Sequence, residues 1–217
     1  MSAAPASRPI PAPPGARTDL VDTLAGIAPG SALEQLRSRR PVARFHTQES
    51  EEALFGASAG GAVTQQERSA VAAFVTGLHG QGPLARHAHE RLAALDPALS
   101  LAIRREIGSA RAEGPFGRYP AGPLSAEDTA GLVYAVDETG RTALGPKLAA
   151  ALEHAHLLVF RPREASPSAL QSLLDAGWTT DAVVTLSQIV AFLTFQIRVV
   201  AGLTVLNAHP AAQEPRP

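Results

Sequence analysis

Two histidine pairs stand out as residues whose type and spacing could do chemistry. His87 and His89 form one His-Ala-His motif in an alanine-rich stretch, and His154 and His156 form a second one. Imidazoles converging from two elements could hold zinc, iron or copper. Residues two apart, however, point to opposite sides of a helix, so each pair offers one ligand to a given point. We therefore predict no metal site and expect partly exposed helix histidines.

Acid–base chemistry is a second possibility, and it involves His79 and His87. His79 ends the helix predicted after Thr64, and His87 lies near the start of the next helix. A histidine near a carboxylate can move protons at neutral pH. We expect both imidazoles to face one pocket and name them as the catalytic candidates. The alternatives are that His79 only complements the helix dipole and that His87 is a surface or subunit-contact residue.

Arg198 is the third candidate, because it is the only formal charge after Asp181 in a long apolar stretch. That stretch is predicted to be a helix that begins at Thr179 or Thr180. A guanidinium on an apolar helix needs a carboxylate, a carbonyl or an anionic ligand, so Arg198 is a candidate for substrate binding, with a structural salt bridge as the alternative. Polar residues interrupt the helix too often for a good membrane span. We expect a core or subunit-interface helix and no membrane partner.

The elements that must position these residues are predicted to be helices. Apolar residues recur at spacings of three and four residues along the chain, and alanine is abundant. Thr64 and Glu67 form a capping box that begins a strong helix, Gly80 stands where that helix should end, and Pro83 begins the next. Further helices are expected over residues 19–27, 31–39, 47–55, 99–107, 147–160 and 167–176, with another beginning at residues 125–128. The predicted fold class is all-α, a bundle of about eight helices.

Composition limits the domain organisation and the partners. Residues 1–17 are rich in proline and alanine and are predicted to form a disordered arm. Residues 18–206 are predicted to form one helical domain, and residues 207–217 to form a disordered tail. The 19 basic and 20 acidic residues give no basic patch for nucleic acid. No signal-peptide core is visible, so a cytoplasmic location is expected.

The chain has no cysteine, which excludes disulfides, thiolate metal ligands and cysteine nucleophiles. It also lacks a phosphate loop, a dinucleotide fingerprint, a GxSxG elbow and an HExxH motif. These absences argue against common nucleotide-dependent enzymes and hydrolases. No cofactor is expected.

Two segments resemble the carboxymuconolactone decarboxylase and alkylhydroperoxidase D-like superfamily. Residues 161–203 contain a short helix, an "AG" turn and a long apolar helix ending in an arginine, in the order seen in peroxidase-related members of that family: RPREASPSALQSLLDAGWTTDAVVTLSQIVAFLTFQIRVVAGL. Residues 63–92 resemble the family's active-site helix pair: VTQQERSAVAAFVTGLHGQGPLARHAHERL. The resemblance implies an all-helical, alkylhydroperoxidase-like fold in a cysteine-less subfamily.

The resemblance also implies which positions face a ligand. In redox-active relatives a helix carries a glutamate, and a CxxC pair and a histidine follow about twelve residues later. These family positions fall here on Ser69, Gln81, Leu84 and Ala88, and a shift of one residue from Ala88 supplies His87. The peroxidatic thiol and its relay base are therefore absent. Ser69 and Gln81, with Arg198, remain candidates for substrate binding.

The functional prediction is a decarboxylase-domain protein without redox cysteines. It would perform proton transfer on a small organic molecule, or bind one, and whether it is an enzyme is left open. The resemblance implies a homo-oligomer held by the long terminal helix. The alternative is a non-catalytic subunit or scaffold, paired with a cysteine-bearing relative, and a metal enzyme is the third choice.

Overall fold

The computed structural model describes residues 19–57 and 59–209, and this part of the chain is all-α, as the sequence predicted. The predicted arm, residues 1–17, and most of the predicted tail lie outside the described residues. An isolated β-bridge joins Gly117 to Thr129. The nine α-helices of the described part are α1 (Leu20–Leu24), α2 (Ala32–Ser38), α3 (Pro41–Phe55), α4 (Gln65–Leu78), α5 (Pro83–Leu95), α6 (Pro97–Ala110), α7 (Glu138–Phe160), α8 (Pro167–Asp175) and α9 (Thr180–Ala208).

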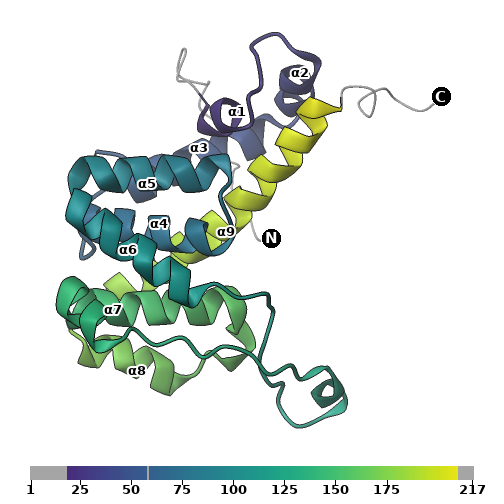
Figure 1. Ribbon diagram of the computed structural model, residues 1–217. Coiled ribbons are helices and arrows are strands. Elements are labelled where there is room, and N and C mark those ends of the chain that lie inside the picture. Colours follow the sequence, from purple (N-terminus) through teal and green to yellow (C-terminus); the bar gives the residue numbers. More distant parts are fainter. Residues whose placement is uncertain (1–18, 58, 210–217) are drawn as a thin grey trace, which may run out of the picture.

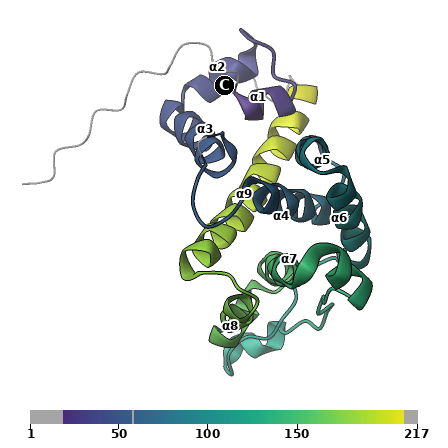
Figure 2. The same ribbon diagram turned by 90° about the vertical axis from the view of Figure 1, so that its left-hand side faces the viewer.

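Helix α4 is the centre of the molecule, and α5, α6, α7 and α9 pack around it (Figures 1 and 2). Every residue from Arg68 to Leu78 is buried. Its first turn contains the predicted capping box, in which Thr64 and Glu67 satisfy each other's backbone donors. Small residues on α4 let its neighbours approach closely: a Cβ added at Gly77 would lie 2.4 Å from Ile107 of α6.

The turns around α5 and α6 follow the predicted signals. Gly80 has φ 127°, a conformation that favours glycine, and it ends the turn after α4. Pro83 is in the first turn of α5, where a missing N–H costs nothing. Asp96 caps α6 by accepting a hydrogen bond from the backbone N–H of Leu99.

The segment between α6 and α7 differs from the prediction. Residues 125–128 were expected to begin a helix, but only a 3₁₀ turn, Pro123–Glu127, forms, and residues 129–136 are extended. Glycine and proline on the N-terminal side of the turn favour an irregular path, and Tyr134 and Val136 bury their side chains from this extended segment. Within α7 the chain is kinked at Gly145, with φ 74°, so its second half begins at Pro146 as predicted.

Helix α9 runs from α8 at one end of the molecule to α1 at the other (Figure 1). Thr179 caps it, and it continues to Ala208, two residues past the predicted end of the domain at residue 206. By length and composition α9 is apolar enough to cross a membrane, with mean hydropathy 2.0. Only 28% of its most apolar window is buried in the described structure. Much of its apolar surface therefore has no partner within the described part of the chain.

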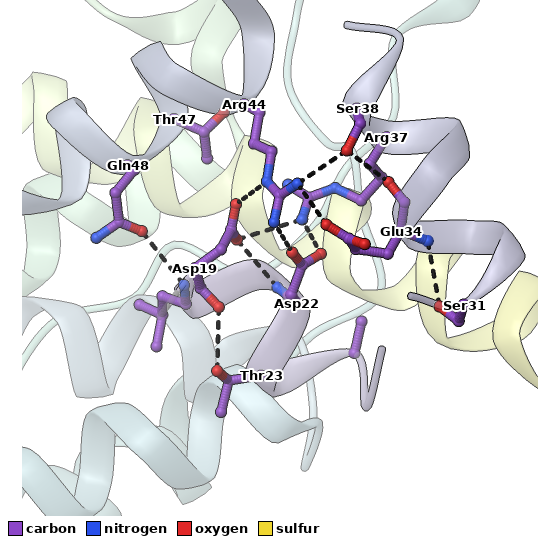
Figure 3. A network of polar contacts seen from close by, with 12 residues as sticks. Asp19, Asp22, Thr23, Ser31, Glu34, Arg37, Ser38, Arg44, Thr47 and Gln48 are labelled. Carbon is purple, nitrogen blue, oxygen red and sulfur yellow. Dashed lines mark hydrogen bonds and ion pairs between the residues drawn. The ribbon is translucent and has the colours of Figure 1, made fainter. Parts of the chain in front are cut away.

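Helices α1, α2 and α3 form a separate layer over the C-terminal half of α9 (Figure 2). Helix α2 ends before Pro41, and Pro41 itself lies in the first turn of α3, which starts six residues earlier than expected. An ionic network links the three helices (Figure 3). Its members are Asp19, Asp22, Glu34, Arg37 and Arg44, and each carboxylate is paired with at least one arginine.

Candidate functional site

The five predicted site residues lie on α4, in the turn after it, on α5 and on α9, at different depths, and neither His79 nor His87 lines any of the cavities described below. His79 is the C-terminal cap of α4 and is exposed. Two effects lower the pKa of His79. The larger is partial desolvation of its ring, and the smaller is the nearby positive charge of Arg198 on α9. Arg198 is exposed, and it donates to the Thr194 carbonyl of its own helix at 2.7 Å. The structural salt bridge considered for Arg198 is absent from the described residues.

His87 is half-buried on α5 and lies beside a buried ion pair. Arg91, one turn later, donates to Glu51 of α3 at 3.2 Å and covers the Phe55 ring at 4.2 Å. Burial, and then repulsion from Arg91, lower the pKa of His87. Gln196 of α9 completes what we call the Glu51 cluster (Glu51, Arg91 and Gln196).

The Glu51 cluster contains polar atoms without good partners. Gln196 is fully buried, and neither amide atom makes a hydrogen bond of normal geometry. Glu51 Oε2 and Arg91 Nε are also buried without a hydrogen bond. Burial raises the pKa of Glu51, and Arg91 and Gln196 only partly offset this. His87 therefore neighbours Arg91, which is paired with an incompletely satisfied carboxylate.

Ser69 and Gln81 do not meet. Ser69 is buried in the second turn of α4, where it lines a hollow of about 110 Å³ with Phe55 and Arg68. Gln81 is exposed in the turn after α4, and its backbone carbonyl accepts from Arg86 at 3.1 Å. Nine residues of helix separate Ser69 from the end of α4, a distance of ~14 Å at 1.5 Å per residue. The positions taken from the family resemblance thus lie at opposite ends of the α4–α5 hairpin.

A different cavity, which we call the His154 cavity, brings titratable groups together. It has a volume of about 240 Å³ and lies between α7, α8 and the extended segment before α7. Its apolar lining includes Val133, Leu157 and Leu173. The polar side chains that line it are Tyr134, Glu153, His154, His156, Arg161, Glu164 and Ser172.

His154 is the lining group that lacks a protein partner. His154 is only 5% exposed to solvent, and neither of its ring nitrogens has a hydrogen bond among the described residues. Burial lowers the pKa of His154, so the ring is neutral at pH 7 and presents one donor and one acceptor. An unsatisfied polar group in a buried position costs free energy unless a ligand or water satisfies it.

The other polar side chains of the cavity are already engaged. Tyr134 donates to the buried Glu106 carboxylate at 2.7 Å, and burial first, with Glu106 second, strongly raises the pKa of Tyr134. His156 Nε2 lies 3.1 Å from the Ala110 carbonyl, to which it must donate. Its ring packs between Tyr134 and Phe160, with centroids 5.1 and 4.8 Å away. These groups build a rigid wall beside His154.

Charges around the cavity are also paired. Glu153 accepts from the Val136 backbone N–H at 2.9 Å and forms an ion pair with Arg141. Arg161 is paired with Glu164 through both its Nε and a terminal nitrogen. The lining therefore offers no unpaired formal charge at neutral pH, which favours an uncharged ligand over an anion.

The expectation of partly exposed histidines is wrong for the second pair: His154 and His156 are both buried. They also line one cavity despite their spacing, because α7 is enclosed on several sides by α6, α8 and α9. A signal was present in the sequence, since His154 follows Ala150 and Ala151 at helical spacing on the apolar stripe. Among the described residues, no group of three or more histidines and carboxylates could hold a metal ion.

Comparison of the chain with protein-family models, with curated proteins and with solved structures gives no significant match. The two segments that carry the family resemblance do pack together, through α4 and α9. Function must therefore be inferred from the chemistry of the cavity.

Proposed function

We propose that this protein binds a small, uncharged organic molecule in the His154 cavity and that the His154 imidazole is its hydrogen-bonding and proton-accepting group. The observation that carries the proposal is the buried, partnerless imidazole in a mainly apolar cavity whose other polar groups are occupied. A concave apolar site with a few convergent polar groups is typical of small-molecule binding. Its volume equals ~8 water molecules at 30 Å³ each.

A neutral imidazole suits both binding and proton transfer. One ring nitrogen can accept a proton from a ligand hydroxyl or activated C–H, while the other donates to a carbonyl. Tyr134 stays protonated because its pKa is raised, so it is a hydrogen-bond donor and not a base. Acid–base chemistry without thiols therefore has a candidate base here, and whether turnover follows is a question for the experiment.

The link to the carboxymuconolactone decarboxylase and alkylhydroperoxidase-like family is part of the same proposal. It is supported by the two resembling segments, which pack against each other, and by a proton-transfer site that needs no cysteine. His79, His87 and Arg198 are the second set of candidate residues, supported by the incompletely satisfied Glu51 carboxylate that pairs with Arg91 beside His87. A cytoplasmic location, without nucleic acid or membrane partners, belongs to this proposal too.

Histidine-detected NMR tests the proposal directly. Phenol and γ-butyrolactone are suitable probes, because both are small and uncharged and one donates while the other accepts. We expect either probe to shift the ring resonances of His154 while leaving those of the exposed His46 in place. His154→Leu should abolish the saturable binding seen by calorimetry, and His87→Leu should leave it unchanged. Shifts confined to His79 or His87 would transfer the site to the second candidate, and the absence of saturable binding by both probes would overturn the proposal.

A further inference from the structure

The outward face of α9 carries a regular exposed stripe. Its members are spaced alternately by three and four residues, and all are exposed. We call it the α9 stripe, and it consists of Asp181, Val184, Gln188, Ala191, Phe195, Arg198, Gly202 and Val205. Val184, Phe195 and Val205 are 52%, 53% and 61% exposed. A 3–4 repeat of this kind is the seam along which two helices pack with a shallow left-handed crossing.

Six members of the α9 stripe, Asp181 to Arg198, are symmetric about the midpoint between Ile189 and Val190, and Gly202 and Val205 lie beyond this symmetric part. Asp181 and Arg198 are equally far from the midpoint, on opposite sides of it. Val184 and Phe195 form a second equidistant pair, and Gln188 with Ala191 forms a third. A copy of the helix laid antiparallel on this midpoint therefore places Asp181 opposite Arg198 and Val184 opposite Phe195, with Gln188 opposite Ala191 near the axis.

The two charged side chains of the stripe have no ionic partner within the described chain. Among the described residues, Arg198 donates only to a carbonyl of its own helix. Asp181 is exposed in the first turn of α9, and only its backbone carbonyl is bonded. A parallel pair of helices would place Arg198 against Arg198 and Asp181 against Asp181, which is unfavourable. Charge complementarity thus selects the antiparallel arrangement.

The surface beside the stripe extends the same contact. A groove of about 640 Å³ lies between α9 and the α2–α3 layer, and Leu36, Ala43 and Phe195 are in its mainly apolar lining. In the antiparallel arrangement the α8 end of the second copy points toward this groove. At that end the side chains of Leu170 and Leu174 are 43% and 39% exposed to solvent.

From these observations we infer that α9 is a two-fold self-association surface, on which a second copy of this chain packs antiparallel with Asp181 of one copy against Arg198 of the other. The inference does not depend on the His154 cavity. Its occupant is a second copy and not a bilayer, because the stripe places its two charges where they neutralise each other across a two-fold axis.

Light scattering of the full chain, coupled to size exclusion, gives the first test. We expect the mass of a dimer at micromolar concentration. Phe195→Glu should give a monomer, because it places a charge where Phe195 packs against the apolar Val184 of the second copy. Leu101→Glu is the matched control, since Leu101 is 71% exposed on α6 and off the stripe, and it should leave the mass unchanged.

A charge exchange tests the register. Asp181→Arg and Arg198→Asp should each raise the dimer dissociation constant by at least about tenfold, which corresponds to ~1.4 kcal/mol. The double variant D181R/R198D should restore dimerisation to within about threefold of the wild type. Weakening in the double variant as great as in the single variants would overturn the proposed pairing.

The lack of native cysteines makes cross-linking specific. Val184→Cys and Phe195→Cys proteins should form a disulfide only when mixed, because each cysteine faces the other position across the axis. Identical positions would be ~16 Å apart along the helix. Cross-linking of either variant with itself would indicate a parallel pair and overturn the proposal. A monomer that binds phosphatidylcholine vesicles would assign the stripe to a membrane instead.

Discussion

The ionic network of α1–α3 and the polar groups of the helical core satisfy their hydrogen bonds very differently. In the network, Arg37 and Arg44 lie between three carboxylates, and each ionic side chain has a partner of opposite charge (Figure 3). In the core, His154 has no hydrogen bond and Gln196 has none of normal geometry among the described residues. A satisfied network fixes local geometry, whereas an unsatisfied buried group stores a cost that a ligand can relieve. The difference separates positions selected for structure from positions available for function.

The largest expected effect comes from breaking the satisfied network. Asp22→Ala removes a carboxylate that pairs with both Arg37 and Arg44 and leaves two partly buried guanidinium groups with fewer partners. We expect a loss of ~3 kcal/mol in the free energy of unfolding, measured in urea. Arg39→Ala, on the exposed surface at the end of α2, is the control and should change stability by less than ~0.5 kcal/mol. Equal effects would show that the network contributes no stability.

The opposite sign is expected in the Glu51 cluster. Gln196→Met replaces a fully buried amide that has no good hydrogen bond with an apolar side chain of similar volume. We expect the free energy of unfolding to rise by ~1.5 kcal/mol. Gln65→Met, at an exposed position in the first turn of α4, should have little effect. Destabilisation by Gln196→Met would mean that the Gln196 amide has a strong hydrogen-bond partner in solution. The core would then not differ from the ionic network in how its polar groups are satisfied.

A pH-dependent effect is expected at His154. Because burial lowers its pKa in the folded state, the unfolded chain takes up a proton below the ordinary value of 6.5 that the folded chain does not. Stability is therefore lost as the pH falls below about 6.5. His154→Leu should reduce the wild-type loss between pH 7 and pH 5.5 by ~1 kcal/mol, at 1.36 kcal/mol per pKa unit. Equal pH slopes for both proteins would show that His154 is not buried as a neutral ring.

The smallest effect is expected at Glu67. Like the carboxylates of the ionic network, the Glu67 carboxylate has hydrogen-bond and ionic partners, but it is only partly buried. Burial opposes its ionisation, but Lys147 and the Thr64 backbone outweigh burial and lower the pKa of Glu67. Glu67→Gln should cost ~0.5 kcal/mol at pH 7, and the difference should vanish in acid, where the carboxylate is protonated. Glu90→Gln, at an exposed position of α5, is the control. A difference that persists at pH 2 would point to packing and not to charge.

Local signals account for the parts of the fold that the sequence predicted. The capping box at Thr64, Pro83 at the start of α5 and Thr179 before α9 each act over one helical turn, so a single sequence reveals them. The error at residues 125–128 has a tertiary cause: Tyr134 packs against Phe74 and bonds to Glu106. No local pattern contains those partners.

The candidate site was harder to predict than the fold. The His154 cavity joins α7, α8 and an irregular segment, and its key property is the absence of a partner for one ring. Absence of a partner is a property of the assembled core and cannot be read from spacing. Helix spacing alone predicted a partly exposed His154, because spacing carries no information on how many helices surround α7.

The position of α9 has a consequence for the order of assembly. This helix begins about a hundred residues after α4 ends, yet it contacts that central helix, and Asn207 near its end donates to the carbonyl of Gly26 at 2.8 Å. The core therefore cannot close before α9 has been made. Until then the nascent chain exposes apolar surface of α4 that the folded molecule buries.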